Sequence, residues 1–417
     1  MTIRKLLPLD ILIHFFTLGA QLQSSSPHPI PVVPSPLDPK VSMTSNSPKV
    51  SQDLHVLSQL TVNPATAVTA VDYIAGLNAE QRDALVMLAD SNHVVVRAFQ
   101  VVAAMAGNND ALASWANSVL SREQQRIQNA LTFLHHICDA LEQGGCPTTV
   151  MKSLDHWPDL GNDLDLYTTA DERQVVQIMT ARMGAHTEPR SWGDRLANKW
   201  NFAVPGLPES VEVHAQRLGQ TGEHIAMARR FVTRRVPKSV GGLTFLVPAP
   251  EERVIVATLQ RMYRHFYFRV CDIVNTCALL EEGTHHPSTP EAGGPGTPET
   301  LDFAELKKAA DMGGVWPGVA TYLKIVCDYV REYRGSAPEL PNEVLAAARF
   351  GGEVIQARGK FLRVPILPNG ADLYTRQVTN TALRGDVPAT LRLSLLPYLA
   401  SAAAVAFRIT GSDKGIW

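Results

Sequence analysis

The 417-residue chain has few cysteines, almost no net charge and no long hydrophobic run. Its five cysteines are widely spaced and form no Cys-x-x-Cys pair, which argues against a zinc site and a disulfide framework. We therefore expect reduced thiols and a cytoplasmic protein. There are 38 lysines and arginines against 40 aspartates and glutamates, for a formal net charge of -2. Because nucleic-acid-binding domains are usually strongly basic, any charged partner must be bound by a local patch.

The N-terminus combines a basic start with an apolar run, as a secretory signal does. However, Asp10 and His14 interrupt this run, and "GAQLQS" is a poor small-residue cleavage site. The run is also too short to cross a bilayer comfortably, so no membrane partner is expected. Residues 21–50 are rich in proline and serine and predict a linker. We expect residues 1–50 to be a disordered tail, or to be included in the sequence only because the start codon was assigned too early. A signal peptide is the alternative.

Helical periodicity dominates both flanks of the chain. It is present over residues 51–121 and is clearest over residues 122–142, where apolar residues recur at three- and four-residue steps. It returns over residues 248–350, interrupted by a loop rich in proline and glycine near residues 282–300. Residues 351–417 mix short apolar runs and are the least readable part.

The region between the helical flanks has β character. Short alternating or β-branched runs predict four strands, and a helix with capping-box spacing follows the second strand. These strands cover residues 148–153, 163–168, 201–206 and 209–218, and the helix covers residues 169–184. The order of elements predicts an α+β chain with a small α/β core.

Acidic residues alternate along two of these strands. Asp163 and Asp165 point to the same side of one strand, with Cα atoms roughly 6.6 Å apart. Glu212 and His214 share one side of another strand. Three converging carboxylates suit Mg²⁺, which prefers oxygen ligands and keeps part of its water shell. A solvated strand edge would show the same alternation.

Four stretches, in this order and spacing, resemble the nucleotidyltransferases of the DNA polymerase β superfamily, and more narrowly an uncharacterised bacterial nucleotidyltransferase family. The resemblance covers roughly residues 122–335. The stretches are "VMKSL" (150–154), "GNDLDLYTTADE" (161–172), "VEVHAQRL" (211–218) and "VPAPEERVIVATLQRMYRHFYFRVCDIVNTCALL" (247–280).

This resemblance implies a nucleotidyltransferase core with a mixed sheet at residues 122–247. It also implies transfer of a nucleoside monophosphate from an NTP to a hydroxyl, with release of pyrophosphate. Asp163 and Asp165 match the paired metal-binding aspartates and Glu212 matches the third acid, so two Mg²⁺ ions, or Mn²⁺, are expected. Lys152 and Ser153 match the segment near the triphosphate. His214 would orient Glu212 or contact the substrate, or else be structural.

Two departures from the family pattern leave a second hypothesis open. Ser153 replaces the glycine that usually follows the lysine, and "PDLGN" replaces an arginine that often precedes the Asp-x-Asp. Both changes are compatible with a catalytically silent binding or regulatory module. The acceptor stays open among small molecules, proteins and RNA.

One dense basic run occurs at residues 229–235, with the sequence "RRFVTRR". Arginines favour phosphates, which would make this run a contact for substrate or nucleic acid. The other interpretation is a solvated helix face.

Overall fold

The structure is a computed structural model that describes residues 48–218, 225–282, 301–365, 369–395, 398 and 402. The tail predicted for residues 1–50 lies outside these residues except for its last three positions, and so does nearly all of the loop near residues 282–300. Helices and strands are both present, which confirms the α+β class. Among the described helices, none combines the length and apolarity needed to cross a bilayer.

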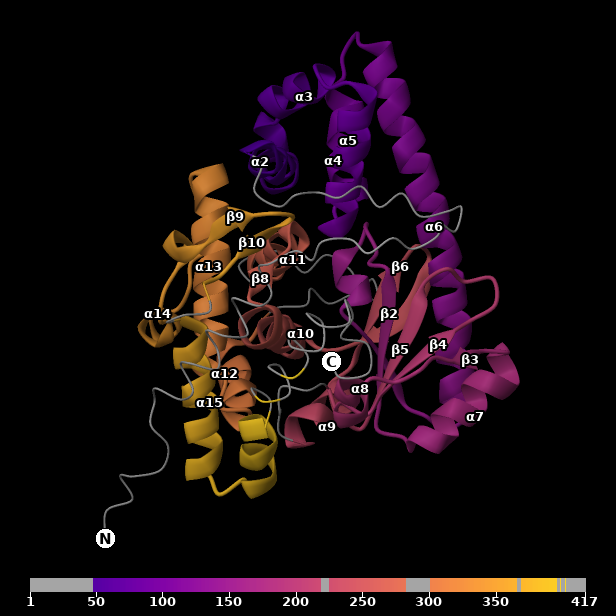
Figure 1. Ribbon diagram of the computed structural model, residues 1–417, viewed down its shortest axis with the longest axis vertical. Helices are drawn as coiled ribbons and strands as arrows, with labels where there is room; N and C mark the ends of the chain where they lie inside the picture. The colour runs from indigo at the N-terminus through magenta and orange to yellow at the C-terminus, as the bar shows by residue number, and fades with distance from the viewer. Residues whose placement is uncertain are drawn as a thin grey trace, which may run out of the picture.

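The centre of the fold is a five-stranded mixed sheet with the order β1-β2-β5-β4-β3 (Figure 1). Strands β2 and β5 run parallel, and all other neighbours run antiparallel. The strands are β1 (Thr148–Met151), β2 (Asp163–Thr168), β3 (His186–Thr187), β4 (Lys199–Ala203) and β5 (Ser210–Ala215). Strands predicted at residues 148–153, 163–168, 201–206 and 209–218 are therefore confirmed, with shifted ends.

The two central strands separate polar from apolar side chains. Leu164, Leu166, Val211 and Val213 alternate to one side and are fully buried. On the other side, helix α9 (Ile225–Thr233) covers one end of the sheet through Phe231, whose ring meets that of Tyr167 edge-on at 5.9 Å. Helix α9 thus does not cover the other end of this face, where β2 begins and where the acidic residues lie.

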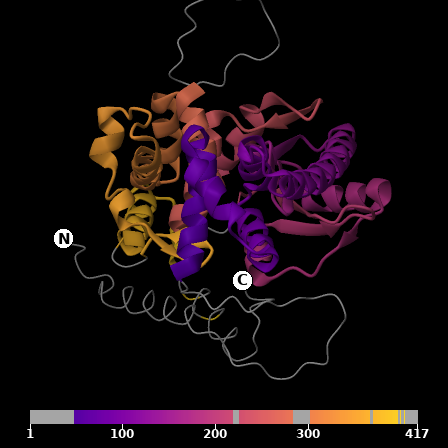
Figure 2. The same cartoon turned by 90° about the horizontal axis from the view of Figure 1, so that it is seen from above.

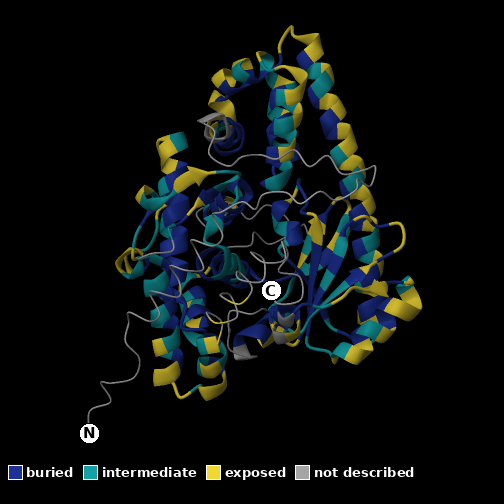
Figure 3. Cartoon of the chain, in the orientation of Figure 1, coloured by how far each residue is buried: buried dark blue, intermediate teal, exposed yellow. Residues whose placement is uncertain are grey.

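A helical region precedes the sheet. It comprises α2 (Pro48–Val62), α3 (Val68–Ala75), α4 (Ala79–Ser91), α5 (Val95–Met105) and α6 (Asp110–Gln143). Asn78 caps the start of α4, and Gln81 completes a capping box with it. Residues 122–142, predicted as a helix of their own, are the second part of the 34-residue α6. Helix α7 (Glu172–Met183) packs beside α6, and Figure 3 shows both with exposed outer faces.

A hairpin that the periodicity did not indicate follows α9. Its strands are β6 (Val236–Val240) and β7 (Leu243–Val247). Gly241 and Gly242 have φ values of +58° and +81°, which suit a two-residue turn of this kind.

The C-terminal half is a second layer beside the sheet. Its helices are α10 (Pro250–Thr258), the π-helix η3 (Leu259–His265), α11 (Val270–Glu282), α12 (Phe303–Met312), α13 (Trp316–Arg334), α14 (Asn342–Ala347) and α15 (Ala371–Leu383). Within the helical region predicted for residues 248–350, the chain leaves the helical conformation at Phe266, which has a left-handed φ of 54°. In the view from above, the orange and yellow elements, α12 to α15, lie on one side and the magenta sheet on the other (Figure 2).

The predicted C-terminal extension contributes a small sheet to this half. Strand β10 (Phe361–Arg363) pairs with β9 (Gln356–Arg358) and with β8 (Tyr267–Phe268). A segment near residue 360 is therefore joined to the break between η3 and α11.

Candidate active site

The pairing of β2 with β5 places the predicted acidic residues together. Asp165 is the direct neighbour of Glu212, Asp163 of Ser210, and Tyr167 of His214. Because alternate residues share a side, Asp163, Asp165, Glu212 and His214 all lie on one face of the sheet.

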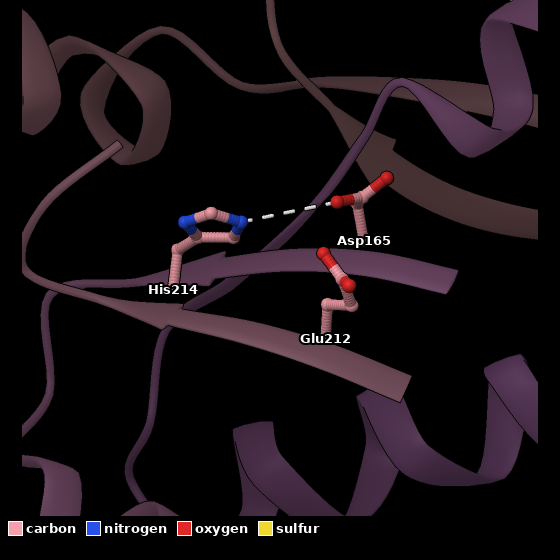
Figure 4. Close-up of side chains that lie close together, drawn as sticks. All are labelled: Asp165, Glu212 and His214. Atoms are coloured by element: carbon pink, nitrogen blue, oxygen red, sulfur yellow. Dashed lines mark ion pairs between the residues drawn. The ribbon is translucent and has the colours of Figure 1, made fainter. Parts of the chain in front are cut away.

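Three of these side chains form a compact cluster. Asp165, Glu212 and His214 each offer a ligand atom, and these atoms all lie within 4.8 Å of one another (Figure 4). His214 is only 3% exposed and Asp165 only 7%, whereas Glu212 is partly open to solvent. Asp163 lies two residues before Asp165 at the exposed start of β2.

Lys152 neutralises the most buried carboxylate. Its Nζ lies 2.5 Å from Asp165 Oδ1. It follows β1 directly and has a left-handed φ of 54°, an uncommon conformation for a lysine. Burial by itself would raise the pKa of the Asp165 carboxyl, but the Lys152 ammonium and the His214 ring bring that pKa below its ordinary value.

Ser153 supports the backbone of the acidic strand. Its hydroxyl donates to the Asp163 carbonyl oxygen at 3.1 Å and accepts a hydrogen bond from the Asp165 amide at 2.9 Å. The side chain is buried and begins the short helix η2 (Ser153–His156). Both hydrogen bonds hold β2 in position. Ser153, which was predicted to lie near the triphosphate, therefore supports the backbone of this strand.

Glu212 has its own cationic partner, Lys199. The Lys199 Nζ lies 3.0 Å from Glu212 Oε1 and 3.1 Å from Asp194 Oδ1, and these two carboxylates raise the lysine pKa despite its burial. Lys199 was not identified from the sequence because the strand was predicted to begin at residue 201. Strand β4 begins at Lys199 and places it opposite His214.

Asp163 carries the unbalanced negative charge of this face. Desolvation and the nearby carboxylates of Glu212 and Asp165 raise its pKa to about 6, although Lys152 and Lys199 oppose the shift. A carboxyl group that titrates near neutrality can exchange a proton at physiological pH.

The cluster has donor atoms that suit a divalent cation. Both ring nitrogens of His214 are buried without a hydrogen-bond partner among the described residues, and Asp165 Oδ1 is contacted by the Lys152 ammonium. The His214 Nε2 lies 3.8 Å from Asp165 Oδ1, which is too long for a direct hydrogen bond. Burial lowers the His214 pKa, which keeps the imidazole neutral and able to bind a metal. Two carboxylates and one imidazole fit Mn²⁺ and similar ions at least as well as Mg²⁺.

The basic run at residues 229–235 has a different role from both predicted ones. Arg230 lies 2.7 Å from Glu252 and from Glu305, and Arg234 lies 2.8 Å from Glu251. Arg235 pairs with Glu142. Three of the four arginines thus connect α9 and its C-terminal end to α10, α12 and α6, and only Arg229 is an exposed face residue.

Comparison of the chain with protein-family models, with curated proteins and with solved structures found no match.

Proposed function

We propose that the protein is a metal-dependent nucleotidyltransferase that moves a nucleoside monophosphate from an NTP to an acceptor hydroxyl. The observation that supports this most strongly is the parallel register of β2 and β5. It sets Asp165 beside Glu212, with His214 completing a set of metal-binding atoms.

In this proposal Asp165, Glu212 and His214 hold one divalent ion, Mg²⁺ or Mn²⁺. When bound, the ion supplies charge neutralisation for the phosphates of the donor. The resemblance implies two ions, and the cluster found among the described residues accounts for one.

The remaining polar residues orient the reactants. Lys152, which lies against Asp165, would contact the triphosphate as a point charge. Ser153 keeps the β2 backbone in place through its two hydrogen bonds. Positioning and charge neutralisation are the main contributions a protein makes to phosphoryl transfer.

The transfer itself exchanges one P–O bond for another. The acceptor oxygen bonds to the α-phosphorus, and the bond from that phosphorus to the oxygen bridging the β-phosphate breaks. Pyrophosphate leaves with the electron pair, and the acceptor proton passes to Asp163, whose raised pKa of about 6 suits a general base.

One observation favours a second candidate function, a nucleotide-binding module without transfer. Lys152 and Lys199 already neutralise Asp165 and Glu212, so the fold can bury these carboxylates without a cation. Such a module would bind an ATP analogue but transfer nothing.

Labelling in cell extract separates the two candidates. The protein is incubated with extract, α-labelled NTPs and Mg²⁺ or Mn²⁺, beside Asp163→Asn, Asp165→Asn and the control Asp83→Asn, which changes an exposed acid on α4. We expect label transfer by the wild type and Asp83→Asn only. Equal labelling by the wild type and all three variants would reject the proposed enzyme. Binding of a non-hydrolysable ATP analogue in calorimetry, without any labelling, would favour the nucleotide-binding module.

A further inference from the structure

A second polar surface lies on the small sheet formed by β8, β10 and β9. On β10, Leu362 points to the core and is 3% exposed, so Phe361 and Arg363 point to the opposite side. Arg363 is paired with Tyr267, and Phe361 with Arg358. Residues from two distant segments of the chain therefore share this outer face, which we call the basic-aromatic face.

Asn92 at the end of α4 fixes the basic-aromatic face in place. Its side-chain oxygen accepts a hydrogen bond from the Val270 amide at 3.0 Å, and its amide nitrogen donates to the Lys360 carbonyl at 3.0 Å. The two segments are thus held to one another and to the N-terminal helices.

The centre of the face is a stacked aromatic pair. The rings of Tyr267 and Phe361 are 4.3 Å apart with an interplanar angle of 11°, and both are partly exposed. The guanidinium groups of Arg261 and Arg363 lie 5.4 and 5.8 Å from the Tyr267 ring, and that of Arg269 lies 5.9 Å from the Phe361 ring. Arginine side chains thus surround two flat apolar surfaces.

The charge of the face is of one sign. Residues 259–271 and 355–365, which form it, contain no aspartate or glutamate. Arg261 pairs with Asp272 at 2.7 Å. Within the described part of the chain, no carboxylate lies within ion-pair distance of the other three arginines of the face, Arg269, Arg358 and Arg363. In a chain with a net charge of -2, this is a concentrated positive patch.

A series of side-chain contacts connects this face to the short helix beside the acidic site. The Arg269 guanidinium contacts Nε2 of His93, and the His93 ring stacks on that of His156 at 5.0 Å. His156 ends η2, the short helix that follows Lys152. Burial, and then the positive charges of Arg264, Arg261, Arg269 and Lys152, lower the pKa of His265, which is consistent with one continuous basic environment.

We propose that the basic-aromatic face binds single-stranded nucleic acid and directs its terminal hydroxyl to the acidic site. This inference rests on the proposed function and names its acceptor. Aromatic faces stack on bases whatever their sequence, and arginines contact the phosphates between them.

Fluorescence anisotropy tests the inference directly. The full chain is titrated against fluorescein-labelled single-stranded RNA and DNA of about 12 nucleotides between 50 and 200 mM KCl. The variant Arg358→Glu/Arg363→Glu reverses two exposed charges of the face, and Arg122→Glu/Arg173→Glu makes the same change at exposed sites on α6 and α7. Phe361→Ala and Phe361→Leu probe stacking, with circular dichroism to verify the fold.

We expect the double reversal to weaken binding at least tenfold and to make the salt dependence shallower, with a slope smaller by about 1.4. The control pair should change affinity less than twofold. Loss of the ring in Phe361→Ala and Phe361→Leu should weaken binding about tenfold, because each stacked base contributes on that scale. The RNA and DNA arms identify which polymer the face prefers.

Equal binding by the wild type and the double reversal overturns the inference, and so does the absence of oligonucleotide binding. Attachment to vesicles of anionic lipid without oligonucleotide binding also overturns it and identifies a membrane surface instead. Failure here is distinguishable from failure of the proposed function. If label transfer depends on Asp165 but not on the residues of the basic-aromatic face, the proposed enzyme activity stands and the proposed nucleic-acid acceptor is rejected.

Discussion

Asp165 and Glu212 are direct neighbours on two parallel strands, and each carboxylate has its own lysine. Like charges this close repel, so a protein must balance them with cations. Lys152 approaches from the end of β1 and Lys199 from β4, on opposite sides of the acidic pair. Asp163 has no lysine at ion-pair distance among the described residues, and desolvation together with the carboxylates of Glu212 and Asp165 raises its pKa.

Replacing Asp165 by asparagine should abolish transfer while preserving the fold. The change removes the negative charge and one acceptor oxygen from the cluster but nearly preserves the size of the side chain. We expect a loss of label transfer of about 100-fold or more, since single electrostatic groups in active sites contribute on this scale. Label transfer and circular dichroism measure the two effects, and transfer within a factor of two of wild type would contradict the proposed site.

His214 should determine which metal the site prefers. If its imidazole is a ligand, His214→Ala weakens Mn²⁺ binding about tenfold or more and affects Mg²⁺ much less, because nitrogen ligands favour transition metals. Saturating Mn²⁺ at 100 times its Kd should stabilise the wild type by about 2.7 kcal/mol, and EDTA should reverse this. Thermal unfolding with each metal gives the comparison. Identical Mn²⁺ shifts in wild type and variant would exclude His214 as a ligand.

Lys152 should compete with the metal for Asp165. We expect Lys152→Met to strengthen Mn²⁺ binding by about fivefold or more, since a lysine close to the carboxylate contributes about 1 kcal/mol even at the dielectric constant of water. The same change should weaken binding of an ATP analogue. Isothermal titration calorimetry measures both. Lys308→Met, at an exposed position on α12, is the matched control. A variant that loses metal and nucleotide affinity together would show that Lys152 supports the site instead of competing for it.

Asp163 makes stability depend on pH in a defined direction. Its folded-state pKa of about 6 lies above the ordinary value of 3.8, so the folded protein binds the proton more tightly than the unfolded chain. The resulting stabilisation is complete below pH 3.8 and is lost as the pH rises through 6. Asp163→Asn should therefore raise the unfolding midpoint at pH 7.5 and change it little at pH 4. The gain should be below about 1 kcal/mol, because an exposed carboxylate is screened by solvent. A variant less stable than wild type at pH 7.5 would contradict this assignment.

The neighbouring arginines of α9 should differ sharply in their effect on stability. Arg230→Ala leaves the fully buried Glu252 without its closest partner, and we expect a cost of about 3 kcal/mol. Arg229→Ala, at the exposed neighbouring position, should be nearly neutral. Urea unfolding midpoints of the two variants test this. Equal midpoints would favour the other interpretation of residues 229–235, a solvated helix face.

Local pattern was sufficient for the alternation that defines the acidic face. Side chains alternate along a strand because of its extended backbone, whatever the fold around it. Asp163 and Asp165 therefore share one side of their strand, and Glu212 and His214 share one side of theirs. Helix periodicity likewise indicated α6 and α7, since each must bury a stripe of apolar residues.

Contacts between distant segments were outside the reach of such patterns. The sequence did not predict that Lys199 meets Glu212, that the arginines of α9 pair with buried glutamates, or that Tyr267 stacks on Phe361. Each of these contacts depends on chain packing that brings together residues between 13 and 94 positions apart. Periodicity reports which side of an element is buried, but only the folded chain selects the partner on the other side, because that choice minimises unpaired buried charge over the whole molecule.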